Sequence, residues 1–172
     1  MTRDRDPTGR PRNARPRDAL GRPLGRAEPE ASQTRIPDDL AITGPDAARL
    51  ADQLLREGRP FHAHEVLEAA WKSAPPRERD LWQGLAQIAV GLTHARRGNA
   101  RGAVALLRRG TQRVRAHQDQ PQPPTGHKAD HPYDMDIPAI LAASDDLAAR
   151  IERYGLDDLP PADLTPRLLA RP

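Results

Sequence analysis

The sequence predicts a single all-α domain of about five helices with a disordered N-terminal tail. Three observations support this fold class. Apolar residues recur at intervals of three and four along the middle of the chain, which places them on one face of a helix. No segment shows the alternation of polar and apolar residues that a half-buried strand requires. Glycines, prolines and capping residues separate the helical patterns from one another.

The first two helices are expected to form a hairpin. The first begins at residues 43–46 (Thr-Gly-Pro-Asp), where a proline in the first turn and an early acid favour a helix start. Gly58 ends it, and Pro60 opens the second helix. The second helix stops before residues 75–76, because two prolines there cannot continue a helix.

Three further helices follow from the same signals. The third carries its apolar residues over residues 81–92 and ends near Gly98. Asn99 caps the fourth helix, since a short polar side chain can accept a hydrogen bond from a free backbone N–H there. Asp136 caps the fifth in the same way, and Gly155 ends it.

Composition predicts the domain boundaries. The chain of 172 residues contains 19 Pro and 12 Gly. Residues 1–37 are rich in Arg and Pro and have few large apolar groups, so burial there cannot offset an ordering entropy of about 1–2 kcal/mol per residue. We expect a disordered tail there, a helical domain over residues 38–155 with a polar loop at 119–134, and a flexible C-terminal segment at 156–172.

Several classes of protein are excluded. The absence of Cys excludes a disulfide scaffold, a thiolate zinc site and a cysteine nucleophile. No apolar run approaches the roughly 20 residues that span a bilayer, and the N-terminus has no apolar stretch typical of a secretory signal. We therefore expect a cytoplasmic protein with no membrane partner.

The basic character of the chain invites a nucleic-acid interpretation. The sequence pI is about 9.9, but only Lys72 and Lys128 are lysines. An excess of Arg, Ala and Pro with little Lys is typical of a GC-rich coding sequence. Six arginines recur along the fourth helix, at positions 97, 101, 108, 109, 113 and 115. No aromatic side chains lie between them to stack on bases, so a solvated helix face is the better interpretation and no nucleic-acid partner is expected.

Apolar helix ridges would suit a homo-oligomer, although no residue requires one.

The second helix carries the residues that are the best candidates for ligand binding or catalysis. Three of the five aromatic residues of the chain lie between Phe61 and Trp82. His64 and Glu68 are one helical turn apart, so an imidazole and a carboxylate project from the same side. With Trp71 they form the pattern H-x-x-x-E-x-x-W.

Residues 64–68 (His-Glu-Val-Leu-Glu) resemble the zinc-protease motif H-E-x-x-H with its second His replaced by Glu. In that interpretation His64 and Glu68 bind a divalent metal, preferably zinc, and Glu65 acts as the general base. A catalytic zinc needs three protein ligands, and His94 on the third helix is the third ligand we would choose. The predicted pocket around the metal is lined by Phe61, Trp71, Trp82, Gln83 and Gln87.

A non-enzymatic interpretation stays open beside this one. A His and a Glu one turn apart are most often a hydrogen-bonded pair at the edge of a core, and Gln83 and Gln87 could satisfy them. The cluster would then be a polar network that fixes the register of the helices, in a domain that binds a protein partner.

Separated motifs that agree in order and spacing carry a family resemblance: residues 61–71, Glu78-Arg79-Asp80, Gln83-Gly84-Leu85, Ala89, His94, Arg97-Gly98-Asn99 and Gly102-Ala103. Together they resemble the domain of unknown function 309 family of bacterial and archaeal helical proteins, over about residues 44–152. The resemblance implies an all-α domain and metal binding, with metal-dependent hydrolysis as the suggested activity.

Overall fold

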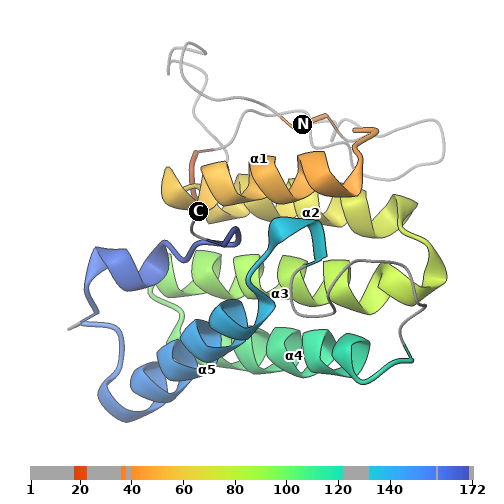
Figure 1. Cartoon of the computed structure of the whole chain (residues 1–172). Helices are drawn as coiled ribbons and strands as arrows, with labels where there is room; N and C mark the ends of the chain where they lie inside the picture. Colours follow the sequence, from red (N-terminus) through yellow and green to blue (C-terminus); the bar gives the residue numbers. More distant parts are fainter. Residues whose placement is uncertain (1–17, 23–35, 38–39, 122–131, 158, 171–172) are drawn as a thin grey trace, which may run out of the picture.

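A computed structural model of the chain describes residues 18–22, 36–37, 40–121, 132–157 and 159–170. The described residues form five α-helices and no named strand, which confirms the predicted all-α fold (Figure 1). The helices are α1 (Gly44–Arg56), α2 (Pro60–Ser73), α3 (Arg79–Arg96), α4 (Ala100–Gln118) and α5 (Ile137–Tyr154). In the part of the chain that is described, no helix is long and apolar enough to cross a membrane.

The helix starts lie where the capping residues predicted them. The Asn99 side chain accepts a hydrogen bond from the Gly102 N–H at 2.9 Å at the start of α4. Asp136 accepts one from the Ala139 N–H at 3.1 Å at the start of α5. Each bond satisfies a backbone donor that the first turn of a helix leaves free.

Short 3₁₀ helices complete the secondary structure of the described residues. They are η2 (Pro76–Glu78), which joins α2 to α3, η3 (Pro132–Asp134), which precedes α5, and η4 (Pro161–Leu164). An isolated antiparallel bridge pairs Met135 with Leu169. It brings the residues just before α5 next to the C-terminal part of the chain.

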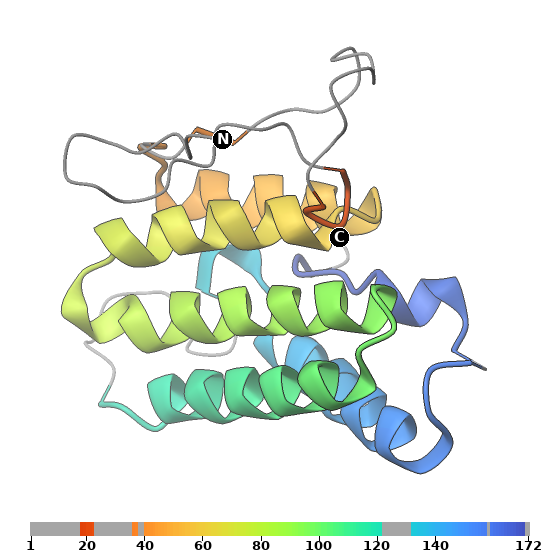
Figure 2. The same cartoon turned by 180° about the vertical axis from the view of Figure 1, so that it is seen from behind.

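Consecutive helices pack against one another, and α5 runs obliquely across the stack of the other four (Figures 1 and 2). The core is most extensive around α3, whose Trp82, Leu85 and Leu92 are almost fully buried. Gly84 of α3 and Gly110 of α4 let these two helices approach closely. A Cβ at either position would overlap the backbone carbonyl of the other.

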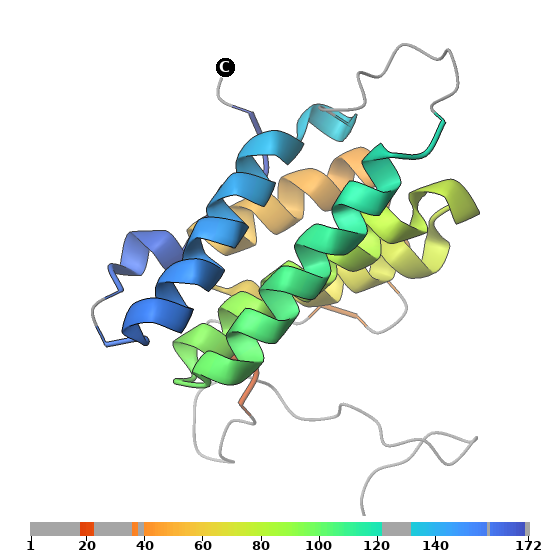
Figure 3. The same cartoon turned by 90° about the horizontal axis from the view of Figure 1, so that it is seen from below.

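The arginines of α4 mostly bond to neighbouring helices. Arg108 pairs with Glu152, and Arg115 pairs with Asp145, both on α5, the helix that lies beside α4 in Figure 3. Arg113 reaches Asp80 of α3 at 2.8 Å. Since these pairs connect three helices, much of the arginine stripe already has partners within the domain.

The predicted disordered tail at residues 1–37 lies mostly outside the described residues. Two described pieces of it pack on the domain. Residues 18–22 form a turn against α2, in which Gly21 is buried against Phe61, and Ile36 is only 6% exposed. The low apolar content of the whole stretch does not reveal these few packed positions.

The C-terminal segment at 156–172, which its prolines predict to be flexible, has described residues that pack on the domain. Leu168 is 2% exposed in the core. The backbone N–H groups of Leu168 and Leu169 donate to Oδ1 of the buried Asp52 of α1, at 2.8 and 3.2 Å. Residues 159–170 therefore contact the first helix of the domain through both apolar and polar groups. The predicted loop at 119–134 is described at its two ends, and residues 122–131 lie outside the described part.

Candidate functional site

The helix α2 presents two different faces. Its Ala63, Val66 and Leu67 are fully buried against the rest of the domain. His64, Glu65 and Glu68 lie on the other side of the helix and are partly exposed. The polar side chains therefore sit at the margin of the core, where they lose part of their hydration.

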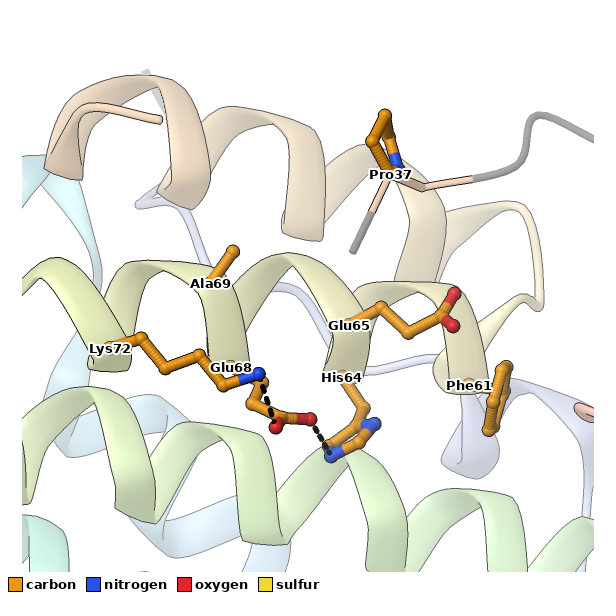
Figure 4. A pocket seen from close by; sticks show the side chains of 7 residues that line it. All are labelled: Pro37, Phe61, His64, Glu65, Glu68, Ala69 and Lys72. Carbon is orange, nitrogen blue, oxygen red and sulfur yellow. Dashed lines mark ion pairs between the residues drawn. The ribbon is translucent and has the colours of Figure 1, made fainter. Parts of the chain in front are cut away.

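These polar residues line a surface pocket of about 230 Å³. Its walls are Pro37, Phe61, His64, Glu65, Glu68, Ala69 and Lys72. Figure 4 shows that all but Pro37 come from α2, with Phe61 at one end of the row and Lys72 at the other. Pro37 comes from the segment before α1. The pocket is therefore built from one helix face and one residue of the N-terminal region.

Three ionisable side chains form a chain of contacts in the pocket. His64 Nε2 lies 3.4 Å from Glu68 Oε2, and Lys72 Nζ lies 2.9 Å from Glu68 Oε1 (Figure 4). Because these residues are spaced by four, each contact joins neighbours on successive turns of α2. Glu68 thus shares its carboxylate between an imidazole and an ammonium group.

Burial favours the neutral form of the His64 imidazole. Burial lowers the pKa of His64, an effect that outweighs the opposing influence of the nearby Glu68 carboxylate. Its Nδ1 atom is buried and has no hydrogen-bond partner among the described residues. The Oε1 atom of Gln87 is buried without a partner as well. The interpretation as a structural polar network expected Gln87 to form a hydrogen bond with His64. Since both atoms lack a partner among the described residues, they do not form this bond.

A second histidine on α2 is more deeply buried. His62 is 3% exposed, and burial together with the charge of Arg59 lowers the pKa of this imidazole to about 4, against the opposing charge of Asp18. Its ring contacts Phe61 edge to face, with 5.7 Å between centroids. His62 is therefore a neutral histidine beside the pocket rather than a member of it.

Several predicted site residues lie away from this pocket. His94 is at the end of α3, where its Nδ1 lies 2.8 Å from the Asn99 side-chain amide, so it packs at the turn between α3 and α4. Trp82 is 1% exposed and its ring lies against Tyr133, with 5.4 Å between centroids. Trp71, Gln83 and Gln87 are also absent from the residues that line the pocket.

The pocket residues fit part of a metal site. Two ligands bound tetrahedrally at about 2.1 Å from a zinc ion are about 3.4 Å apart, and His64 Nε2 and Glu68 Oε2 have this separation. A third ligand is not found beside them in the described part of the chain. Among the described residues, no three His, Asp or Glu side chains are grouped so that they could hold a metal ion. Within the described part of the chain, the side chains therefore fit a two-ligand chelate and not a complete catalytic zinc site.

Sequence reasoning missed three residues of the pocket wall. Lys72 lies four residues after Glu68, so the helical spacing that identified His64 could also have identified it. Ala69 is a small residue on the same face. Pro37 carries no local signal, because its position depends on how the N-terminal segment packs on α2.

Part of the chain is similar to known proteins. Residues 49–106 match the model of the family described as "Domain of unknown function (DUF309)". The chain is also 48% identical over 48 residues to the uncharacterized protein YpuF of Bacillus subtilis (strain 168). That alignment covers 27% of this chain and 28% of YpuF, so the chain spans less than a third of the length of this relative. No solved structure matches the chain.

The match includes the whole of α2 and α3 and therefore all pocket residues except Pro37. It is shorter than residues 44–152, over which the motifs suggested a resemblance. Neither the family name nor that of YpuF indicates an activity. Over residues 49–106 the chain is therefore similar to the DUF309 family.

Proposed function

We propose that this protein binds a divalent metal ion, preferably zinc, through His64 Nε2 and the Glu68 carboxylate. The observation that carries the proposal is the separation of 3.4 Å between these two atoms, which matches two ligands of one tetrahedral zinc ion. Both atoms face a pocket of about 230 Å³, which leaves space for an ion and further ligands.

The state of His64 favours this role. A metal binds the neutral imidazole, and burial lowers the pKa of His64 so that the neutral form persists to lower pH than in a free histidine. Glu68 supplies a carboxylate oxygen, but Lys72 already contacts that carboxylate at 2.9 Å. Metal binding must therefore compete with an ammonium group, which favours modest affinity.

Hydrolysis would require a general base and a further metal ligand, in addition to the two ligands that bind the metal. Glu65 lines the same pocket and is the candidate general base. A zinc ion that activates water needs a third protein ligand, and the described residues do not supply one. Metal-dependent hydrolysis would therefore require a ligand beyond His64 and Glu68.

Titration of the purified chain with zinc, followed by calorimetry, tests the proposal. His64→Ala and Glu68→Gln should each weaken binding by more than the roughly tenfold that follows loss of an outer-shell partner. His94→Ala is the matched control, because this residue packs at the α3–α4 turn and not in the pocket. Circular dichroism of each variant shows whether the helices remain intact.

Two results would overturn the proposal. One is equal zinc affinity in the wild type and in both pocket variants. The other is absence of binding in the wild type, in which case His64, Glu68 and Lys72 form a structural polar network and the chain is better treated as a protein-interaction domain. Loss of binding in His94→Ala together with the pocket variants would instead make His94 the third ligand.

A further inference from the structure

The arginines of α4 differ in the acids that they meet. Two of them each pair with an acid of α5, so the charges on that side of the helix are balanced. Two others, Arg109 and Arg113, lie instead near the start of α3, where they share a pocket with Asp80. On this second side, the described residues bring two guanidinium groups together with one carboxylate.

This second surface pocket, the α4 pocket, has a volume of about 330 Å³. Its walls are Asp80 from the first turn of α3 and Arg109, Gln112, Arg113 and Ala116 from α4. The four α4 residues are spaced by three and four, so they share one face of that helix. The α4 pocket has no lining residue in common with the pocket on α2. It is therefore a separate place on the domain.

Asp80 positions Arg113 without using all of its hydrogen-bond donors. Arg113 Nη1 donates to Asp80 Oδ1 at 2.8 Å, and the Arg113 side chain is still 36% exposed. Its Nε–H group is buried and has no partner among the described residues. Since a guanidinium group has five N–H donors, Arg113 keeps donors for a ligand while the ion pair limits its motion.

Arg109 is the cation that lacks an acid of its own. It is exposed, and its side chain forms no ion pair or hydrogen bond with a described residue. Its guanidinium follows from a position one helical turn before Arg113, and like charges at this spacing repel each other. An oxyanion between the two side chains would remove this repulsion and accept hydrogen bonds from both, because guanidinium donors match the geometry of oxyanions.

We propose that the α4 pocket binds a phosphate group, either free phosphate or the phosphate of a small phosphomonoester, through Arg109, Gln112 and Arg113. A phosphate group carries almost two negative charges at neutral pH, and its oxygens can accept from two guanidinium groups and an amide at the same time. The pocket of about 330 Å³ has room for the phosphate and a small organic group. The carboxylate of Asp80 opposes an anion, so the affinity is modest. This inference does not depend on metal binding at His64.

The test is a titration of the isotope-labelled full chain with inorganic phosphate, followed by NMR at constant pH and ionic strength. The side-chain amide of Gln112 should shift and saturate. Arg109→Gln should weaken the affinity about tenfold or more, as expected for the loss of a charge-assisted hydrogen bond. Since Arg109 has no partner among the described residues, this change leaves the contacts of the fold in place. Arg101→Gln is the matched control, because Arg101 is an exposed arginine two turns earlier on α4 and does not line the pocket. Its affinity should stay within about twofold of the wild type, since solvent screens distant surface charges.

Titrations with glycerol phosphate and with acetate identify the chemistry of the ligand. Tighter binding of glycerol phosphate than of inorganic phosphate indicates a phosphomonoester, and equal or weaker binding indicates free phosphate. Acetate that binds as tightly as phosphate would overturn the assignment to a phosphate group. The proposal is also overturned if the pocket residues of the wild type show no saturable shift. It fails as well if Arg101→Gln weakens binding as much as Arg109→Gln, because that result indicates a general attraction to a basic helix.

Discussion

The two ends of the chain are attached to the helical domain in different ways. At the C-terminal end, Leu168 is buried in the core and Asp52 binds two successive backbone N–H groups of the segment. At the N-terminal end, Gly21 of the turn at residues 18–22 packs on the Phe61 ring, and the Leu20 carbonyl accepts a hydrogen bond from the Arg97 guanidinium. Both ends look equally unstructured in composition, yet one is anchored in the core and the other is held at the surface.

This difference teaches that attachment depends on what a segment buries and not on how polar it is. A buried carboxylate that accepts backbone hydrogen bonds cannot release them without leaving polar groups unpaired. A surface contact can open, because water replaces the lost hydrogen bond. We therefore expect changes at the C-terminal end to alter global stability and changes at the N-terminal end to act locally.

The largest effect is expected for Asp52→Ala. This change leaves the N–H groups of Leu168 and Leu169 without their acceptor and removes the partner of Arg56 Nε, which donates to Asp52 Oδ2 at 2.9 Å. Denaturant unfolding should show a loss of about 3 kcal/mol. Asp52→Asn retains an acceptor oxygen and should lose clearly less. Equal stability of Asp52→Ala and the wild type would mean that the C-terminal segment is not anchored through this residue.

Leu168→Ala should have the next largest effect. The side chain is 2% exposed, and truncation of a buried leucine typically destabilises a protein by about 2–4 kcal/mol. Leu169, the next residue, is partly buried, so Leu169→Ala is a close control with an expected smaller loss. A Leu168→Ala variant as stable as its control would contradict the placement of this segment in the core.

The pH dependence of stability tests the burial of His62, near the start of α2. Burial lowers the pKa of His62 from 6.5 to about 4, so the unfolded chain takes up a proton on this imidazole at higher pH than the folded chain does. The contribution of His62 is therefore complete above pH 6.5 and is lost as the pH falls from 6.5 towards 4. With about 1.4 kcal/mol for each pKa unit, we expect a loss on the order of 2 kcal/mol.

Denaturant unfolding of the wild type and of His62→Gln at pH 7 and at pH 4.5 measures this contribution. The variant should lose less stability between the two pH values than the wild type does, whatever its stability at pH 7. His64→Gln is the companion variant, because burial lowers the pKa of His64 in the same direction. Parallel losses in the wild type and His62→Gln would show that His62 does not titrate differently in the two states.

The fold was largely predictable from the sequence, for a physical reason. Caps such as Asn99 and Asp136 act within four residues, so their effect can be recognised without knowing the tertiary structure. The same holds for His64 and Glu68, whose contact follows from helical spacing alone. Local signals were therefore sufficient for the helices and for the central pair of the candidate site.

The remainder of the site depends on contacts that no local pattern records. Pro37 reaches the pocket from before α1, and Leu168 reaches Asp52 across 116 positions of sequence. The choice of His94 assumed that α3 would bring it to His64, but its contact with Asn99 places it at the turn into α4. Choosing between residues of one helix face requires knowing the register of two packed helices, which hydrophobic spacing does not specify.

The smallest expected change in global stability separates the two ends most directly. Arg97→Ala removes the bond from an exposed guanidinium to the Leu20 carbonyl, and exposed contacts of charged side chains typically contribute about 1 kcal/mol or less. Denaturant unfolding should place Arg97→Ala within about 0.5 kcal/mol of Arg101→Ala, as for substitutions at the surface. A loss comparable to that of Asp52→Ala would show that the N-terminal turn is part of the cooperative core.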